Sequence, residues 1–352
     1  MTTSLQDFGL VPFFAQQLAL EEIEQGRVVR VTEVQRSLIR VSDGESEHSI
    51  TITSRWHEVA AEQRPTVGDW VVLDVERARI ERILERKSLF RRVAPGEKAE
   101  IQLIAANIDI LFVVTSCNEE FKESRLERYL ALAAEAGVIP VVVLTKIDLS
   151  NAPEAYAERA QSVQHGVAVE SINALDSNTF DGLMAWIERA STIALVGSSG
   201  VGKSTILNTL TGADVAATSE IREDDKKGRH TTTHRQLHQL PGGGLLIDVP
   251  GMRELKVADV ESALATVFDD IESLASQCRF ADCRHESEPG CAVRGAIEKG
   301  DLDERRLGNY LKLQRENARH TTSLAERRSQ SRAQGKLYKR IQSMKDGRKG
   351  RN

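Results

Sequence analysis

Two short motifs, and their order along the chain, constrain the fold more than any other feature of the sequence. Residues 197–204 fit the phosphate-binding pattern G-x-x-x-x-G-K-[ST]. Residues 145–148, Thr-Lys-Ile-Asp, fit a guanine-recognition loop. In the usual fold that carries both motifs, the phosphate loop comes first and the guanine-recognition loop last. Here the order is reversed, so the chain ends must lie in an unusual place in that fold.

The flanks of residues 197–204 support a nucleotide-binding loop. The apolar run 192–196 predicts a buried strand, and residues 205–210 predict a helix. In such a unit the backbone N–H groups and the helix N-terminus surround the phosphates. A Gly/Ser-rich turn with a chance lysine is the alternative, but it explains neither flank. Lys203 is expected to neutralise phosphate charge and Ser204 to bind Mg²⁺. The nucleotide-binding residues expected here are Gly197, Ser198, Ser199, Gly200, Val201, Gly202, Lys203, Ser204 and Thr205.

The tetrapeptide 145–148 follows the apolar run 141–144, which predicts a buried parallel strand. Ligands of open α/β sheets bind at the carboxyl ends of strands. Asp148 is therefore expected to accept hydrogen bonds from N1–H and the amino group of guanine, while the stem of Lys146 covers one face of the base. Thr145 stands where Asn is usual, which predicts the loss of one tether between loops. A solvated turn is the alternative for so short a pattern.

Two further elements follow the phosphate loop. The strand predicted from residue 245 leads into Asp-x-Pro-Gly, in which Asp248 is expected to hold Mg²⁺ through water and the Gly251 N–H to face the γ-phosphate. Residues 228–233 are polar and occupy the place of a first switch, where Thr231 or Thr232 would complete the Mg²⁺ shell. A flexible loop is the alternative, and both hold if the segment orders only on the triphosphate.

The order of all these elements predicts a circular permutation of the GTPase fold. Guanine recognition comes first, followed by Ser171, whose segment is expected to present a backbone N–H to the guanine carbonyl. The phosphate loop and the two switches come after it. Permutation is physically plausible because domain termini usually lie close together on the surface.

The second switch lacks the residue that often orients the attacking water. Met252 follows Gly251 where many GTPases have Gln, and a thioether cannot hold water. Slow intrinsic hydrolysis is therefore expected. His230 is the internal candidate for a catalytic role beside Lys203; the alternative is a loop histidine bonded to phosphate or RNA.

The C-terminal region contains a compact set of metal-binding residue types. Cys278, Cys283, His285 and Cys291 lie within fourteen residues, and a Cys₃His set is typical of a closed, structural zinc site. A disulfide is the alternative, but it needs an oxidising compartment and leaves one of the three thiols over. Cys117 lies far from this set and is expected to be a buried or half-buried thiol.

The N-terminal region has the composition of a small barrel. Short β-branched runs at 28–31, 38–41, 49–52, 70–75 and 80–83 predict five strands, which suit an OB-fold. Such barrels bind oligonucleotides or only pack against neighbours. The polar start of the chain is assigned no chemistry, and its Phe8, Phe13 and Phe14 are expected to dock on the barrel.

Charge is distributed unevenly along the chain. The total is mildly acidic, with 47 Lys+Arg against 52 Asp+Glu, whereas residues 327–352 hold ten basic residues and the single acid Asp346. This tail is expected to contact a phosphate backbone; a solubilising tail is the alternative. Residues 302–313 predict an amphipathic helix leading to it. No secretory signal or membrane-spanning stretch is visible, which indicates a cytoplasmic protein.

Together these motifs resemble the circularly permuted, small-ribosomal-subunit-dependent GTPases of bacteria (ribosome small subunit-dependent GTPase A). The carriers are residues 67–70 (Val-Gly-Asp-Trp), 145–148, 197–204, 228–233, 248–251 and the Cys₃His set. Ser-Ile-Asn at 171–173 and Val249 depart from the usual pattern, but neither removes a phosphate or metal ligand.

The resemblance implies a multidomain chain with three folded parts. These are an OB-fold barrel over 25–93, a circularly permuted α/β P-loop GTPase domain over 94–274 and a mostly helical zinc-binding domain over 275–326. An extension (1–24) and the basic tail (327–352) flank them. The resemblance also implies a GTPase that uses GTP/GDP, Mg²⁺ and one Zn²⁺. This GTPase would act late in maturation of the 30S subunit, in contact with 16S rRNA. A monomer without DNA or membrane partners is expected.

Two other functions stay open on the sequence. One is a phosphotransferase using the same phosphate loop, which would need an acceptor pocket and a lid with phosphate-clamping arginines. The other is an RNA-binding protein in which GTP is only a structural ligand. RNA affinity that is the same with GDP and with a non-hydrolysable GTP analogue would favour the latter.

Overall fold

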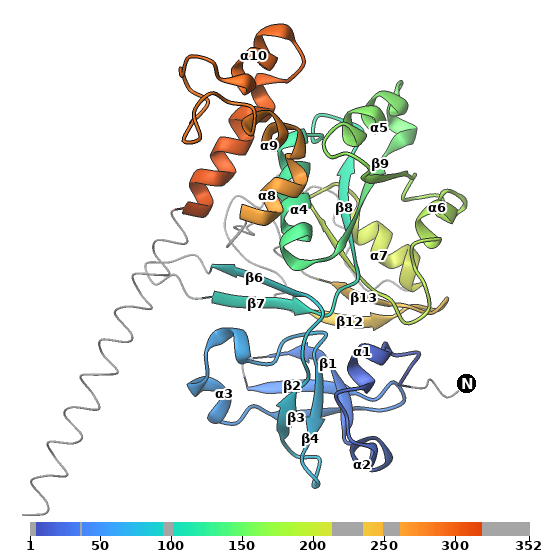
Figure 1. Cartoon of the computed structure of the whole chain (residues 1–352). Helices are drawn as coiled ribbons and strands as arrows, with labels where there is room; N and C mark the ends of the chain where they lie inside the picture. The colour runs from blue at the N-terminus through green and yellow to red at the C-terminus, as the bar shows by residue number, and fades with distance from the viewer. Residues whose placement is uncertain (1–4, 36, 94–100, 213–234, 249–260, 319–352) are drawn as a thin grey trace, which may run out of the picture.

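The computed structural model describes residues 5–35, 37–93, 101–212, 235–248 and 261–318. Figure 1 shows a β-rich part, which contains the N-terminus, at the bottom of the view. A central α/β part lies above it, and a helical part lies at the top. The multidomain architecture predicted from the sequence is confirmed. No helix within the described ranges is long and apolar enough to cross a membrane.

The N-terminal part is the predicted OB-fold barrel, and all five expected strands are present. Strand β1 pairs antiparallel with both β2 and β4, while β2 also pairs with β3 and β4 with β5. Alternate residues such as Val29, Val31 and Val71 fill the barrel core. The helices α3 (Arg55–Glu58) and η1 (Ala61–Gln63) connect β3 to β4. The strands are β1 (Val28–Val34), β2 (Leu38–Ser42), β3 (Glu47–Thr51), β4 (Trp70–Leu73) and β5 (Ile80–Ile83).

The start of the chain docks on this barrel through aromatic rings. It contains the short helices α1 (Pro12–Ala15) and α2 (Leu20–Glu24). Phe8 packs edge-on against Trp70 with ring centroids 6.4 Å apart, and Phe14 lies 6.2 Å from the same indole. Phe13 packs against Phe14 at 5.2 Å. The expected docking of all three phenylalanines is confirmed.

The central part is a mostly parallel sheet with the strand order β10-β9-β8-β11-β13-β12, of which only β12 is antiparallel to its neighbour. The strand that precedes the phosphate loop, β11, lies in the middle between β8 and β13. The chain enters the sheet at β8 and reaches β11 only after β9 and β10, which is the predicted circular permutation. The strands are β8 (Ile110–Ser116), β9 (Ile139–Thr145), β10 (Ala168–Ser171), β11 (Thr192–Gly197), β12 (Gln236–Gln239) and β13 (Leu245–Asp248).

Helices cover both faces of this sheet, which explains why its strands are continuous apolar runs. All seven residues of β8 are buried: Leu111 and Val113 join the core on the side of α4, while Phe112 and Val114 join the core on the side of α7. Cys117, just beyond β8, is buried as expected. The helices are α4 (Glu123–Ala136), η2 (Ile147–Leu149), α5 (Pro153–Gln161), η3 (Ser177–Thr179), α6 (Asp181–Met184) and α7 (Lys203–Thr211).

A hairpin that the sequence analysis did not anticipate connects barrel and sheet. Strands β6 (Leu89–Val93) and β7 (Ile101–Ala106) pair antiparallel, with Leu89 opposite Ala106. The domain boundary expected at residues 93–94 falls inside this hairpin. The turn of the Val-Gly-Asp-Trp motif packs directly on its end: Gly68 has φ +91°, and a Cβ there would lie 2.1 Å from the Ala106 carbonyl oxygen. Only glycine fits this contact.

The C-terminal part is helical and is anchored on α4. It comprises α8 (Glu261–Val267), α9 (Asp269–Ala275), α10 (Ala292–Lys299) and a helix over 304–318, which confirms the helix predicted from residue 302. The buried carboxylate of Glu127 on α4 lies 3.2 Å from both Arg305 and Arg306. Arg306 also pairs with Asp270 at 2.7 Å. The pairs with Glu127 fix the last described helix to the central part, and the pair with Asp270 joins it to α9.

A single buried arginine ties together the barrel, the chain start and the central sheet. The guanidinium of Arg30 on β1 is 1% exposed. It donates to the carbonyl oxygens of Phe8 (3.1 Å), Gly68 (3.1 Å) and Asn107 (3.3 Å), and to Thr192 Oγ1 on β11 (2.9 Å). Burial lowers the pKa of Arg30 to about 10, which leaves it charged at neutral pH.

Replacing Arg30 is expected to destabilise the protein strongly. Arg30→Met keeps the apolar stem but leaves four buried acceptors without their donor, at a cost of about 3 kcal/mol. Urea unfolding followed by tryptophan fluorescence should show a clear drop in the midpoint, since Trp70 packs beside Arg30. Arg40→Met on β2 is the control, because that side chain is 43% exposed and its ion pair with Glu47 joins two exposed side chains. Equal midpoints for the two variants would contradict the role assigned to Arg30.

Candidate nucleotide-binding site

The phosphate loop lies where β11 ends and α7 begins, at the carboxyl edge of the central sheet. All three glycines of the loop have a positive φ, which other residues rarely adopt: +150° at Gly197, +74° at Gly200 and +96° at Gly202. A Cβ at Gly197 would lie 2.2 Å from the Val114 carbonyl oxygen of β8, so a larger residue cannot stand there. The helix α7 starts at Lys203, which turns its N-terminal N–H groups toward the loop.

Lys203 and Asp248 both lie at this edge of the sheet. Lys203 Nζ donates to the Gly197 carbonyl oxygen at 3.0 Å and to the Ser198 carbonyl oxygen. Asp248 is the last residue of β13, the strand next to β11. Burial raises the pKa of the Asp248 carboxyl, and the positive charge of Lys203 opposes that rise. The positive charge of Lys203 therefore acts on the Asp248 carboxyl, and Ser204 is one residue further along α7.

Thr145 links the guanine-recognition loop to the phosphate loop, contrary to the prediction that this residue loses a tether. Its buried hydroxyl lies 2.7 Å from the carbonyl oxygen of Val201, to which it donates, and 3.1 Å from that of Thr115. The prediction was wrong because it counted only the missing amide of Asn. A threonine hydroxyl at the end of β9 is close enough to make the bond itself.

The remaining guanine-recognition residues lie at the same edge. Lys146 adopts a left-handed conformation (φ +57°) that turns the chain out of β9, and Asp148 follows in η2 with an exposed side chain. Ser171 ends β10 opposite Leu144 of β9, and the next N–H, of Ile172, donates to the Leu144 carbonyl oxygen at 2.8 Å. The two loops are therefore adjacent, with the exposed Asp148 carboxylate open to a base.

Four expected site residues lie outside the described residues: His230, Thr231, Thr232 and Gly251. Their roles stay predictions.

One residue beside the phosphate loop was missed by the sequence analysis. Arg125 on α4 donates to Ser198 Oγ and lies 3.2 Å from Glu120. A surface cavity of about 460 Å³ opens here between α4 and the loop. No motif marks Arg125, because its position depends on how α4 packs against β8 and β9. Its neighbours in the cavity lining are Glu120, Arg128, Tyr129, Ser198 and Ser199.

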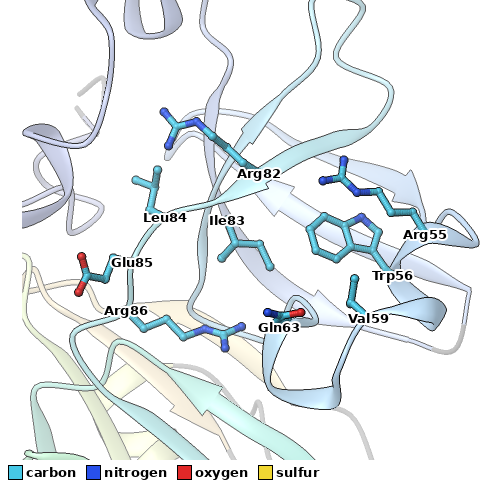
Figure 2. Close-up of a pocket in the computed structure, with 9 residues that line it drawn as sticks. All are labelled: Arg55, Trp56, Val59, Gln63, Arg82, Ile83, Leu84, Glu85 and Arg86. Carbon is cyan, nitrogen blue, oxygen red and sulfur yellow. The ribbon is translucent and has the colours of Figure 1, made fainter. Parts of the chain in front are cut away.

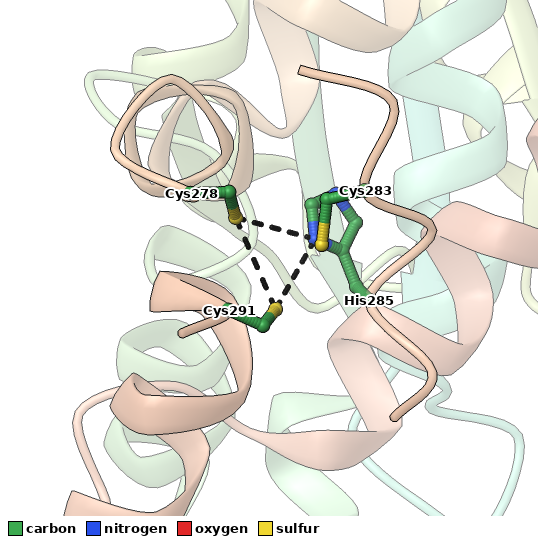
Figure 3. A group of neighbouring side chains, drawn as sticks. All are labelled: Cys278, Cys283, His285 and Cys291. Carbon is green, nitrogen blue, oxygen red and sulfur yellow. Dashed lines mark hydrogen bonds between the residues drawn. The ribbon is translucent and has the colours of Figure 1, made fainter. Parts of the chain in front are cut away.

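The four predicted metal-binding residues come together in one cluster (Figure 3). Their ligand atoms all lie within 4.8 Å of one another. The Sγ atoms of Cys278 and Cys291 are 3.9 Å apart, and they lie 3.7 and 3.4 Å from His285 Nδ1. Tetrahedral zinc with bonds of about 2.3 Å to sulfur and 2.0 Å to nitrogen requires separations of about 3.8 and 3.5 Å. The donor set is therefore compatible with one zinc ion.

A second cavity, of about 430 Å³, lies on the barrel (Figure 2). It is lined by residues of α3 and η1 and by residues 82–86. Two of its arginines are engaged within the chain: Arg82 pairs with Glu22 at 2.8 Å, and Arg86 pairs with the buried Asp69 at 2.7 Å. These contacts indicate that the arginines stabilise the barrel.

The fold and the site define a circularly permuted P-loop GTPase, and comparisons with known proteins agree. The family model described as RsgA GTPase matches residues 83–258. A relative from Vibrio vulnificus (strain CMCP6), "Small ribosomal subunit biogenesis GTPase RsgA 2", is 46% identical over 342 residues, covering 97% of this chain and 96% of its own length. One from Mesorhizobium japonicum, "Small ribosomal subunit biogenesis GTPase RsgA", is 43% identical over 325 residues, covering 90% and 91%. The chain therefore belongs to the RsgA GTPase family, and it is a GTPase.

Solved structures share the fold. The crystal structure of YjeQ from Thermotoga maritima superposes with a TM-score of 0.59 at 24% identity, covering 82% of this chain and 96% of that one. The structure of YloQ, described as a circularly permuted GTPase, gives 0.57 at 24% identity, covering 81% and 92%.

Removing the Thr145 hydroxyl is expected to weaken nucleotide binding. Thr145→Val keeps the shape but leaves the Val201 carbonyl oxygen without its donor, a loss of about 1 kcal/mol or about fivefold in affinity. Titration with a fluorescent GDP analogue measures the change in Kd. Thr211→Val is the matched control, since the Thr211 hydroxyl lies at the far end of α7 and bonds to the Leu207 carbonyl oxygen of the same helix at 2.8 Å. An unchanged Kd in Thr145→Val would show that the tether does not support the site.

Proposed function

We propose that this GTPase is an assembly factor of the small ribosomal subunit, that the 30S subunit stimulates its turnover, and that it binds 16S rRNA late in maturation. The observation that carries the proposal is the full-length match to relatives named small ribosomal subunit biogenesis GTPases, at 46% identity over 97% of this chain. The match includes the barrel and the C-terminal helices as well as the nucleotide site. A chain that only bound or hydrolysed GTP would not need either flanking part.

In the nucleotide site, the proposal assigns guanine recognition to Asp148, supported by Lys146 and by the backbone near Ser171. The phosphate loop would hold the β- and γ-phosphates through its N–H groups and Lys203. Oxygen donors suit Mg²⁺, and Ser204, Thr232 and Asp248 supply two hydroxyls and a carboxylate. Partial burial raises the pKa of the half-buried Asp248 carboxyl, and a bound cation would favour its ionised form.

Hydrolysis requires an oriented water and neutralised charge. Lys203 supplies positive charge at the phosphates from within the loop. Met252 cannot orient water, so the proposal assigns that role to His230 or to a rearrangement on the ribosome. Slow turnover of the free protein follows from either assignment.

The RNA contacts in this proposal come from the barrel and from the basic tail over 327–352, which lies outside the described residues. OB-fold barrels bind oligonucleotides, and ten basic residues in the tail provide favourable electrostatics with a phosphate backbone. The proposed protein acts as a monomer in the cytoplasm, with no DNA partner.

Turnover by the purified chain tests the proposal. GTP hydrolysis should be slow alone and rise at least about tenfold with 30S subunits, because the subunit completes the catalytic arrangement. Lys203→Ala should abolish both rates, and 50S subunits should have no effect. Release of phosphate from GTP measures each rate.

Two other results would each contradict one part of the proposal. Unchanged turnover with 30S subunits would leave the GTP site in place but exclude the ribosomal coupling. Unchanged stimulation in His230→Ala would exclude the catalytic role proposed for that side chain.

The Cys₃His cluster is proposed to hold one structural zinc ion, because all four donors are used and no coordination position stays open for catalysis. Such an ion would fix the loop between α9 and α10, where the described residues form few regular elements. The zinc ion would cross-link that loop and would take no part in a reaction.

Removal of one ligand is expected to abolish metal binding. Cys291→Ser should reduce bound zinc from about one ion per chain to a trace and lower the thermal midpoint, because a structural site needs all four ligands. Elemental mass spectrometry of the purified protein gives the ratio. Cys117→Ser is the control: Cys117 lies outside the cluster, and burial raises the pKa of its thiol to about 11. Loss of zinc in both variants, or in neither, would contradict the assignment.

A further inference from the structure

Helix α4 contacts the phosphate loop at its first turns. Arg125 donates from Nη1 to Ser198 Oγ, and Lys203 Nζ donates to the carbonyl oxygen of the same Ser198. Ser198 is the second residue of the loop, so it is held both from inside the loop and from α4. The Arg125 side chain is 32% exposed and also pairs with Glu120 at 3.2 Å.

The same turns of α4 hold the helix over 304–318. The buried carboxylate of Glu127 accepts from Arg305, Arg306 and Asn309. One residue further along, Arg128 forms a two-pronged ion pair with Glu316, at 2.7 and 3.1 Å. Within four residues, α4 therefore contacts both the phosphate loop and the C-terminal helix.

Arg125 and Arg128 are three residues apart, so they lie on the same face of α4. Both line the cavity of about 460 Å³ that also borders Ser198 and Ser199. A displacement of the C-terminal helix that moves Arg128 must change the charge and the space next to Arg125. Because a helix turn is rigid, the change reaches Ser198 without a long path.

We propose that Arg125 is a positioning residue for the phosphate loop, and that it makes nucleotide affinity depend on how the helix over 304–318 is docked on α4. Arg125 acts through the Ser198 hydroxyl, which it holds in the geometry that presents the loop N–H groups to phosphate. Coupling between two sites is reciprocal. Nucleotide binding therefore changes the docking of the C-terminal helix by the same factor.

A double-mutant cycle in the full-length protein tests the coupling. Glu316→Arg replaces attraction with repulsion at Arg128, and Arg125→Gln removes the guanidinium while keeping a polar group on the same three side-chain carbons. Each single variant should raise the Kd for a fluorescent GDP analogue about fivefold, within the usual range of coupling between sites. The double variant should bind no more weakly than Arg125→Gln alone, because the link is already cut.

Two control variants separate coupling from general damage. Arg159→Gln removes an arginine that pairs with Glu123 of α4 at 2.6 Å. The Arg159 side chain is 50% exposed. Glu298→Arg adds the same charge change at an exposed site on α10. Both should leave the Kd unchanged.

Rescue and additivity decide the outcome. Arg125→Lys keeps a donor and a charge, so it should bind the GDP analogue more tightly than Arg125→Gln does. The two variants should have the same thermal midpoint, which shows that the difference in affinity is not a difference in stability. If the double variant raised the Kd by the product of the two single increases, the two sites would act independently, and this result would overturn the coupling. An unchanged Kd in Arg125→Gln would overturn the positioning role itself, whatever the result with 30S subunits.

Discussion

The relative placement of the parts of this protein depends on one buried cation. Arg30 sits on β1, yet its four acceptors belong to the chain start, to a barrel turn, to the residue after β7 and to β11. A guanidinium is suited to this position, because its donors fan out in one plane and it stays charged when buried. The far end of β11 is the phosphate loop. The barrel is therefore fixed on the strand that leads into the phosphate loop.

A second buried charge has the same function at the opposite side of the nucleotide site. Glu127 is fully buried and satisfied by two arginines and an asparagine of the C-terminal helix. Buried ion pairs add little net stability compared with apolar packing, but they are costly to break and specify one arrangement. The central part is thus held by Arg30 on one flank and by Glu127 on the other. Both flanks are attached within a few residues of elements that contact the phosphate loop or lead directly into it.

The sequence predicts those features that local residue patterns determine. The five barrel strands follow from β-branched runs between turn residues, and the phosphate loop follows from glycines whose backbone conformations other residues avoid. The Cys₃His cluster follows from the short spacing of its members. By contrast, Arg30 and Thr192 are 162 residues apart, and Arg305 and Glu127 are 178 apart. Such pairs, like Arg125 with Ser198, depend on how elements pack. The Thr145 tether was missed because the sequence alone does not give the distance between two loops.

The pairing of β1 with β12 has a consequence for the behaviour of the protein in solution. The central sheet would end at β12, a strand with one row of free backbone N–H and C=O groups, but Glu33 of β1 pairs with Gln236 there. An open sheet edge is a template for pairing with another molecule. The barrel covers this edge within the same chain. It therefore acts as an internal cap that protects the GTPase sheet from intermolecular strand pairing, in addition to any role in binding RNA.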